Sequence, residues 1–243
     1  MNRLAKIFLK HPIKTIRLNS NLKKIAKKNT MPFEERYKYM RDFIDLYHNA
    51  GNIVVKTYGL ENIPKDMDGG LLMSNHQGKS DAMAIFKALP DFPTSFIIND
   101  ERSHMYLMES ICNAFGAKRI NFNDLKSQLR VYNEMADEIV GGKRFIVFPE
   151  AKYTDNKNNL QEFFTPCFVP AIKSKTYVIP ICLYDTYKVL TEPGSKPVYC
   201  EVHFLKPITP EEVEKLNKKE LCDLVKNRIQ EKLDEIKKTK GEK

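Results

Sequence analysis

The sequence predicts a single α/β domain, with a mixed, mostly parallel sheet flanked by helices and a basic helical segment at its N-terminus. Short apolar runs typical of strands alternate with amphipathic runs typical of helices, which favours a sheet covered by helices. A chain of 243 residues is long enough for one large core and short for two. We therefore expect a basic helical, membrane-associating segment over 1–50 and an α/β domain with a C-terminal helix over 51–243.

The first half of the chain shows its elements through apolar spacing and turn residues. Apolar side chains recur at helical steps over 33–47, where core packing is the first interpretation and a lipid-facing surface the second. Turn residues such as Gly116 end the later helices and bound the short apolar strands. The expected strands are 53–58, 71–73, 95–98 and 117–122, and the expected helices are 82–89, 105–115 and 125–140.

The second half continues the alternation. Strands are expected over 144–148, 177–184 and 198–205, with a loop leading into a helix over 163–172. Thr209-Pro210-Glu211-Glu212 is typical of a helix start with a capping box and proline at the first position. Apolar residues at helical spacing over 221–236 predict a long C-terminal helix, and 237–243 is expected to fray.

The net charge of the chain lies at its N-terminus. Nine of the 40 Lys and Arg fall within the first thirty residues, which contain no acid, and this leaves 31 basic against 31 acidic residues elsewhere. Apolar side chains lie among these cations, as in a segment that rests on anionic lipid headgroups. They are Leu4, Ile7, Phe8, Ile13, Ile16, Leu22 and Ile25. A solvated basic arm or an RNA-contacting tail is the alternative, and Pro12 predicts an interruption of any helix there.

The sequence contains no pattern for membrane insertion or for a disulfide framework. No apolar run approaches the roughly 20 residues that span a bilayer, and the basic start is not typical of a signal peptide. We expect a protein bound peripherally at the cytoplasmic face of a membrane. The five cysteines are scattered without a C-x-x-C pair, which indicates buried core thiols and argues against disulfides and a zinc site.

The segment S-N-H-Q-G-K-S-D at 74–81 lies between a predicted buried strand and a predicted helix. Its histidine, His76, can take a proton from a hydroxyl near neutral pH. Asp81 follows where one turn of chain can fold it back beside the ring, and a carboxylate there fixes the tautomer and stabilises the imidazolium. This pattern predicts a general base with its orienting acid, and helix capping by Ser80 or Asp81 is the alternative.

Polar side chains also mark two further predicted strands. Lys118 and Arg119 lie in strand 117–122, and Glu150 and Lys152 follow strand 144–148. Ligands of α/β sheets bind at the carboxyl ends of strands, so we expect these groups to converge with His76 on one crevice. Ordinary surface charge is the alternative for the cations, and a structural acid at a turn is the alternative for Glu150.

These residues resemble the motifs of the glycerolipid acyltransferases, the family of 1-acylglycerol-3-phosphate acyltransferase and other lysophospholipid acyltransferases. Asn75-His76 with Asp81 is similar to the family's N-H-x4-D motif, and F-P-E-A at 148–151 to its F-P-E-G motif. V-I-P-I at 178–181 is similar to a later V-P-I block, and G-L-E-N-I-P at 59–64 to the approach before the histidine. The pieces occur in the family's order over about residues 54–184.

The resemblance implies transfer of a fatty acyl group from a thioester, acyl-CoA or acyl carrier protein, to a hydroxyl of a lysophospholipid such as 1-acylglycerol-3-phosphate. His76 would deprotonate the acceptor, Asp81 would orient His76, and backbone donors near His76 would stabilise the oxyanion. It implies no metal, no cofactor besides the thioester co-substrate and no covalent enzyme intermediate. The expected partners are a membrane lipid surface and that thioester, while donor, acyl-chain length and oligomeric state stay open.

The chain departs from the family at two cationic positions. The family's G-x-x-F-x-D-R motif has arginine where this chain has Phe122, and its F-P-E-G-T-R-S motif has a second arginine where this chain has Tyr153. Arg119 and Lys152 are close enough in sequence to replace them and to pair with a phosphate by charge-assisted hydrogen bonds. The expected substrate-binding residues are Asn75, Lys118, Arg119, Glu150 and Lys152.

Other functions fit parts of the sequence. The missing arginines fit an acyltransferase for a different lipid acceptor, such as a glycolipid or an amino-lipid, and the same fold without turnover would be a lipid-binding or scaffold protein. Nucleic-acid binding rests on the basic segment alone, because the rest of the chain has no clustered basic stripe, so we expect no nucleic-acid partner. A serine hydrolase would need a G-x-S-x-G elbow, which the chain lacks, although Ser74 and Ser80 flank His76.

Overall fold

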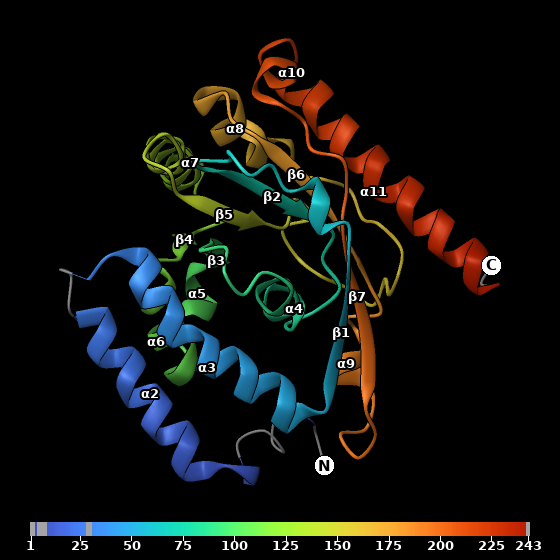
Figure 1. Cartoon of the computed structure of the whole chain (residues 1–243). Helices are drawn as coiled ribbons and strands as arrows, with labels where there is room; N and C mark the ends of the chain where they lie inside the picture. Colours follow the sequence, from blue (N-terminus) through green and yellow to red (C-terminus); the bar gives the residue numbers. More distant parts are fainter. Residues whose placement is uncertain (1–2, 4–8, 28–30, 242–243) are drawn as a thin grey trace.

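A seven-stranded sheet forms the centre of the protein (Figure 1). The computed structural model describes residues 3, 9–27 and 31–241. The strands are β1 (Ile53–Tyr58), β2 (Gly70–Ser74), β3 (Ser95–Asn99), β4 (Lys118–Ile120), β5 (Arg144–Val147), β6 (Val178–Tyr184) and β7 (Val198–Phe204). Their order is β1-β7-β6-β2-β5-β3-β4, and only β6 and β7 pair antiparallel. The predicted single-domain fold with a mixed, mostly parallel sheet is therefore confirmed.

Helices cover both faces of the sheet (Figure 1). One face carries α2 (Pro12–Lys27), α3 (Phe33–Gly51), α4 (Asp81–Ala88) and α6 (Tyr106–Phe115). The other face carries α7 (Leu125–Val140), α8 (Val169–Ser174) and α11 (Lys218–Lys240). The shorter elements are η1 (Leu60–Asn62), α5 (Asp100–Ser103), η2 (Thr165–Phe168), α9 (Lys188–Thr191) and α10 (Pro210–Glu214).

The central strands are buried on both faces because successive side chains point to opposite sides of a strand. In β2, Leu72 packs in the core that contains α3, α4 and α6, whereas Leu71 and Met73 pack in the core that contains α7 and α11. All five residues of β2 are buried. This continuous apolar run carries the chain to residue 75 at the edge of the sheet, which is where the functional motif begins.

Helix α3 contributes its apolar stripe to the core, as the first interpretation predicted. Tyr37, Met40, Phe43 and Ile44 are buried in the same core as α4 and α6. Tyr47 is also buried, and its hydroxyl lies 2.6 Å from the hydroxyl of Ser80. Helix α3 therefore supports the start of α4, directly after the histidine motif.

The ends of three helices test the predicted starts and stops. The capping box of Thr209 and Glu212 begins α10 as predicted. Helix α11 continues to Lys240, beyond the predicted end, because Lys237 bonds Asn159 at 2.7 Å and the Lys240 ammonium lies 2.9 Å from the carboxylate of Glu201. Pro12 interrupts the helical segment as predicted, because residues 9 and 10 are helical, residue 11 forms a bend, and Pro12 is the first residue of α2, where a missing N–H has no cost.

The basic segment is partly core and partly surface. Leu22 and Ile25, expected to contact lipid, are buried, whereas Ile13 and Ile16 are 82% and 68% exposed. The other expected residues, Leu4, Ile7 and Phe8, lie outside the described residues. Across the part of the chain that the structure describes, no helix has both the length and the apolarity to cross a membrane. The five cysteines are buried and unpaired, as predicted.

Candidate functional site

Four of the predicted site residues, Asn75, His76, Asp81 and Glu150, lie together at the carboxyl ends of three neighbouring strands. Strand β2 lies between β5 and β6, with Met73 opposite Val147 and Ser74 opposite Ile181. The segment 75–81 continues from β2, the segment 148–164 continues from β5, and residue 185 follows β6. The strand-end argument from the sequence therefore places His76 and Glu150 together correctly.

The side chains of His76 and Asp81 are in direct contact. The Nδ1 atom of His76 lies 2.7 Å from Oδ2 of Asp81, and the Asp81 side chain is fully buried. The same Oδ2 accepts hydrogen bonds from the backbone N–H groups of Gln77 at 2.5 Å and Gly78 at 2.8 Å. A carboxylate fixed in this way holds the proton of the imidazole on Nδ1 and leaves Nε2 as the acceptor.

Two aromatic rings contact the imidazole of His76. The ring of Phe148 stacks on His76 with centroids 4.3 Å apart, and the ring of Tyr153 stands edge-on at 4.9 Å. The His76 side chain is still 16% exposed. Among the described residues, Nε2 has no protein partner, so it is free to meet a hydroxyl.

Buried amides form the wall behind the histidine. Asn75 bonds both backbone groups of Leu183 on β6, at 2.9 Å to the carbonyl and 2.7 Å from the N–H. The amide of Gln77 donates to Asn158 and to the Leu183 carbonyl, both at 3.0 Å, and accepts from the N–H and hydroxyl of Thr186. These bonds leave the two residues that flank His76 almost no rotational freedom.

The C-terminal helix closes this wall from outside. Asn158 donates to the carboxylate of Asp185 at 2.9 Å. Asp185 also pairs with Lys188 at 2.8 Å and lies 3.9 Å from the ammonium of Lys240 on α11. A chain of polar contacts therefore connects Gln77 to the end of a helix whose sequence carries no functional motif.

The Glu150 carboxylate bonds the backbone of His76 instead of its imidazole ring. It is buried, its Oε1 accepts the backbone N–H of His76 at 3.2 Å, and its Oε2 accepts from the amide of Gln161 at 2.5 Å. Burial raises the pKa of this carboxyl to about 7, and the bonds from Gln161 and His76 oppose that rise only partly. Glu150 thus fixes the backbone of the histidine and titrates near neutral pH.

The cations predicted from sequence are placed unequally. Lys118 pairs with Glu134 and Glu138 on α7, at 3.1 Å and 2.6 Å, and these bonds outweigh burial in raising its pKa. Arg119 donates to Ser103 at 2.9 Å and to Asn113 at 2.7 Å. Lys152 is exposed on the loop after Glu150, and no side-chain partner of it occurs among the described residues. Of the three, only Lys152 presents an ammonium without a protein partner.

Sequence reasoning missed Arg102, which lies beside Tyr153. The Arg102 guanidinium donates to the Tyr153 hydroxyl at 3.0 Å and lies 5.5 Å from the centre of its ring. Arg102 is exposed on α5, the turn that follows β3. The strand-end rule could have found it, because β3 runs parallel to β5 and ends at the same edge.

Several groups near His76 are already engaged. The backbone N–H groups of His76, Gln77 and Gly78 all donate to carboxylates, so these expected oxyanion donors are occupied in this structure. The Ser80 hydroxyl meets Tyr47, and that of Ser74 donates to the backbone carbonyl of residue 75. Within the described residues, no cluster of His, Cys, Asp or Glu has the composition of a metal site.

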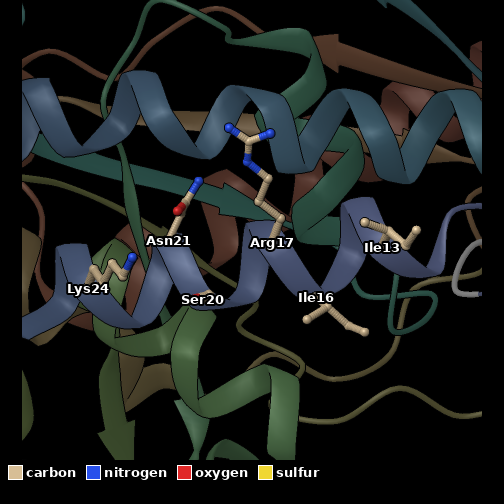
Figure 2. A pocket seen from close by; sticks show the side chains of 6 residues that line it. All are labelled: Ile13, Ile16, Arg17, Ser20, Asn21 and Lys24. Carbon is tan, nitrogen blue, oxygen red and sulfur yellow. The ribbon is translucent and has the colours of Figure 1, made fainter.

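A separate hollow of about 450 Å³ runs along α2 (Figure 2). It is lined by Ile13, Ile16, Arg17, Ser20, Asn21 and Lys24. Figure 2 shows Arg17 and Asn21 extending from one side of the helix and Ile16 from the other. None of these residues is among those that contact His76, so the chain presents a mixed basic and apolar surface away from the strand ends.

Comparisons with known proteins agree with the geometry. A family model described as Acyltransferase matches residues 54–184, which is just over half of the chain and includes every predicted site residue. Among solved structures, the fold is similar to the crystal structure of the 1-acyl-sn-glycerophosphate (LPA) acyltransferase PlsC from Thermotoga maritima. That match has a TM-score of 0.76 at 18% identity and covers 97% of this chain and 95% of that one. None of the curated proteins matches the chain.

Proposed function

This chain belongs to the acyltransferase family, as its motifs implied, and on this premise we propose that it acylates a hydroxyl of a lysophospholipid with His76 as the general base. The observation that carries the proposal is the 2.7 Å contact between Nδ1 of His76 and the buried carboxylate of Asp81. This contact directs Nε2 toward the exposed side of the ring, where an acceptor can reach it.

The proposed reaction has two proton transfers and no enzyme-bound acyl group. Nε2 of His76 takes the proton of the acceptor hydroxyl while the oxygen attacks the thioester carbonyl. The tetrahedral intermediate then collapses with loss of the C–S bond, and the imidazolium returns its proton to the departing thiolate. Asp81 stabilises the imidazolium between the two steps, and burial of this carboxylate strengthens that interaction.

The roles expected for the other predicted residues separate under this proposal. Asn75 and Glu150 use their polar atoms on Leu183, His76 and Gln161, so they position the base instead of binding substrate. Lys152 is left as a cation that can reach a substrate. Direct transfer also fits the serine hydroxyls, since neither Ser74 nor Ser80 bonds His76 among the described contacts.

Membrane contact by α2 is part of the proposal, because lysophospholipid and product both reside in the bilayer. Ile13 and Ile16 are exposed beside Lys10, Lys14 and Lys24, and apolar side chains among cations bind anionic lipid surfaces. Flotation with vesicles of anionic lipid tests this contact. The double variant Ile13→Ser with Ile16→Ser should float less, and equal flotation would remove α2 from the proposal.

Two other interpretations stay open to the same assays. An acyltransferase for a different lipid acceptor fits the absence of arginine at positions 122 and 153. A lipid-binding protein without turnover would keep the fold and the His76–Asp81 contact. The experiment therefore offers lysophosphatidate beside other lysolipids and a glycolipid, with acyl-CoA and acyl carrier protein as donors.

His76→Ala is the test of mechanism. We expect turnover to fall by at least about 10²-fold, because the hydroxyl loses its base. Exposed Arg130→Gln on α7 is the control and should keep the wild-type rate, since no side-chain partner of Arg130 occurs among the described residues. Near-normal turnover in His76→Ala would falsify the proposal, and absence of transfer to any acceptor by the wild type would favour the lipid-binding interpretation.

A further inference from the structure

Arg102 and Tyr153 form a pair beside the base that the proposed reaction does not yet use. The Tyr153 ring stands edge-on to His76, with centroids 4.9 Å apart, and its hydroxyl accepts from Nη1 of Arg102 at 3.0 Å. A single side chain therefore lies between the imidazole and the guanidinium. The pair lies beside His76, where the parallel strands β3 and β5 both end.

The Arg102 guanidinium carries a charge that no acid of the described chain neutralises. Its neighbours on α5 do not pair with it, since the Asp100 carboxylate meets His104. The side chain is exposed, and the bond to Tyr153 uses one of its nitrogens, which leaves the other donors of the fork open. A planar guanidinium with open donors matches the oxygens of a phosphate in two parallel hydrogen bonds.

Side-chain hydrogen bonds fix the backbone of the turn that carries Arg102. Nε of Arg119 donates to the Ser103 hydroxyl at 2.9 Å, and that hydroxyl donates to the backbone carbonyl of Asp100 at 2.7 Å. Asn99 caps the same turn by accepting the N–H of residue 101. Arg119, expected from sequence to bind substrate, is thus placed to hold the backbone from which Arg102 extends.

We propose that Arg102, oriented by the Tyr153 hydroxyl, binds a phosphate group of a substrate beside His76 and sets the preference of the enzyme for phosphate-bearing substrates. The pair replaces, at different sequence positions, the cations absent at Phe122 and Tyr153. The inference rests on the proposed function for its substrates. The phosphate belongs either to the acceptor headgroup or to the CoA part of the donor.

The acceptor headgroup is the expected source. In a lysophospholipid the phosphate is esterified to the carbon next to the one that carries the free hydroxyl, so a hydroxyl bonded to His76 brings its phosphate to the neighbouring side chains. In acyl-CoA, the pantetheine arm separates the thioester from the phosphates by many bonds. A phosphate one side chain away from the base therefore fits the acceptor better.

Steady-state kinetics with three acceptors test the proposal. The acceptors are a lysolipid with a phosphate monoester, a lysolipid with a zwitterionic phosphodiester, and uncharged monoacylglycerol. Arg102→Gln should raise KM for the monoester about 10- to 100-fold, as expected for loss of a charge-assisted hydrogen bond, and leave KM for monoacylglycerol unchanged. Arg102→Lys and Tyr153→Phe should show the same pattern with smaller changes, since each keeps one part of the pair.

Two control variants make the result specific. Arg130→Gln removes an exposed arginine of α7 that has no contact with His76, Arg102 or Tyr153 among the described residues. It should change neither KM nor kcat. Lys152→Gln removes the cation that the sequence predicts, and its effect should be smaller than that of Arg102→Gln. Equal KM values for wild type and Arg102→Gln with all acceptors and both donors would overturn the proposal, as would an effect confined to Lys152→Gln.

The donors separate the two sources of phosphate. A KM effect of Arg102→Gln on the monoester acceptor assigns the site to the headgroup. An effect on acyl-CoA alone, with acyl carrier protein and all acceptors unchanged, supports a phosphate site that serves the donor.

A binding measurement separates this proposal from the proposed function. The protein has five histidines, and His76→Ala assigns the His76 ring-proton resonances. Titration with sn-glycerol 3-phosphate should shift them in a saturable way in wild type and Arg130→Gln, but not in Arg102→Gln. A shift without turnover supports the phosphate site while the proposed function fails. Turnover without a shift, and without the KM effect, overturns the phosphate site alone.

Discussion

The two sides of His76 are built in opposite ways. Behind the ring, Asp81, Asn75 and Gln77 are buried, and their polar atoms bond backbone or other buried amides. In front of it, Arg102 and Lys152 are exposed on a short helical turn and on a loop. The back therefore fixes one geometry, while the front can change its side chains without disturbing the core.

This contrast separates the chemistry from the choice of substrate. Proton transfer needs the base within a fraction of an ångström of its productive position, which a buried, hydrogen-bonded wall provides. Recognition of a headgroup needs only charge and hydrogen-bond donors within reach. Under the proposed function, the choice of acceptor can therefore change through exposed side chains such as Arg102 and Lys152 while the His76 side stays intact.

Asp81→Asn should have the largest effect on the back of the site. The carboxamide oxygen takes the place of Oδ2, because the backbone N–H groups of Gln77 and Gly78 need an acceptor there, so Nδ1 keeps its partner but the imidazolium loses its negative charge partner. We expect kcat to fall on the order of 10²- to 10⁴-fold with little change in fold. Turnover and urea unfolding measure the two properties separately.

Asp91→Asn provides the comparison, because Asp91 is an exposed acid that pairs with Arg41 at 2.6 Å. Its kcat should equal that of the wild type. If Asp81→Asn also kept its kcat within a few fold, the carboxylate would have only a structural role, and the proposed division between back and front would lose its main support.

Asn75→Ala should destabilise the protein because it removes the hydrogen bonds between Asn75 and the backbone of Leu183 in β6. The Asn75 oxygen accepts the Leu183 N–H at 2.7 Å, and this N–H is buried. Truncation leaves it without a partner, which costs about 1–3 kcal/mol in the free energy of unfolding. Urea unfolding at neutral pH measures the loss. Exposed Asn123→Ala should stay within about 0.5 kcal/mol of wild type, and an equal effect of both variants would contradict the wall described here.

Glu150→Gln should change how stability depends on pH. The folded-state pKa is about 7 because burial disfavours the charged carboxyl, whereas the ordinary pKa of glutamate is 4.5. Between these two values the unfolded chain is ionised and the folded chain is protonated, so Glu150 makes the free energy of unfolding fall as pH rises. The contribution is at most about 1.4 kcal/mol per pH unit, and it is flat below and above that window.

The difference between wild type and Glu150→Gln isolates this contribution. Burial lowers the pKa of His48 to about 4, so that histidine makes stability rise with pH up to about 6.5 and partly masks Glu150 in the wild type. Urea unfolding between pH 4.5 and 7.5 should give two curves that converge at low pH and separate toward pH 7. Parallel curves would mean that Glu150 titrates at its ordinary pKa.

The sequence revealed the back of the site better than the front, for a physical reason. His76 and Asp81 come from one segment, so their contact follows from local geometry. The partners of Gln77, by contrast, come from loops at residues 158 and 186, and no spacing rule connects them. The rule that functional groups gather at the carboxyl ends of parallel strands did predict that His76 and Glu150 would lie together, after β2 and β5.

Of the front, the sequence predicted Lys152 but not Arg102, because this side depends on short elements and on competition between charges. Helix α5 has only four residues, too few for a periodic signal, yet it carries Arg102. Lys118 was expected to face substrate, but the two carboxylates of Glu134 and Glu138 hold it on α7. The sequence does not show which of several nearby cations pairs with an acid, because that depends on the folded structure. Lys118 pairs with two acids, whereas Arg102 pairs with none of the described acids and can bind a ligand.

The smallest expected effect lies at the junction of the two sides. Ala151 follows Glu150 at φ 61°, in the left-handed region, where the motif it resembles has glycine. An L-residue there costs roughly 1–2 kcal/mol, while glycine costs about 0.5–1 kcal/mol in chain entropy. Ala151→Gly should therefore raise the free energy of unfolding by about 0.5 kcal/mol and leave kcat unchanged.

The control variant Ala136→Gly in α7 should lower the free energy of unfolding by about 1 kcal/mol, because helical backbone favours alanine. If both variants were destabilised equally in urea, the turn at Ala151 would be unstrained.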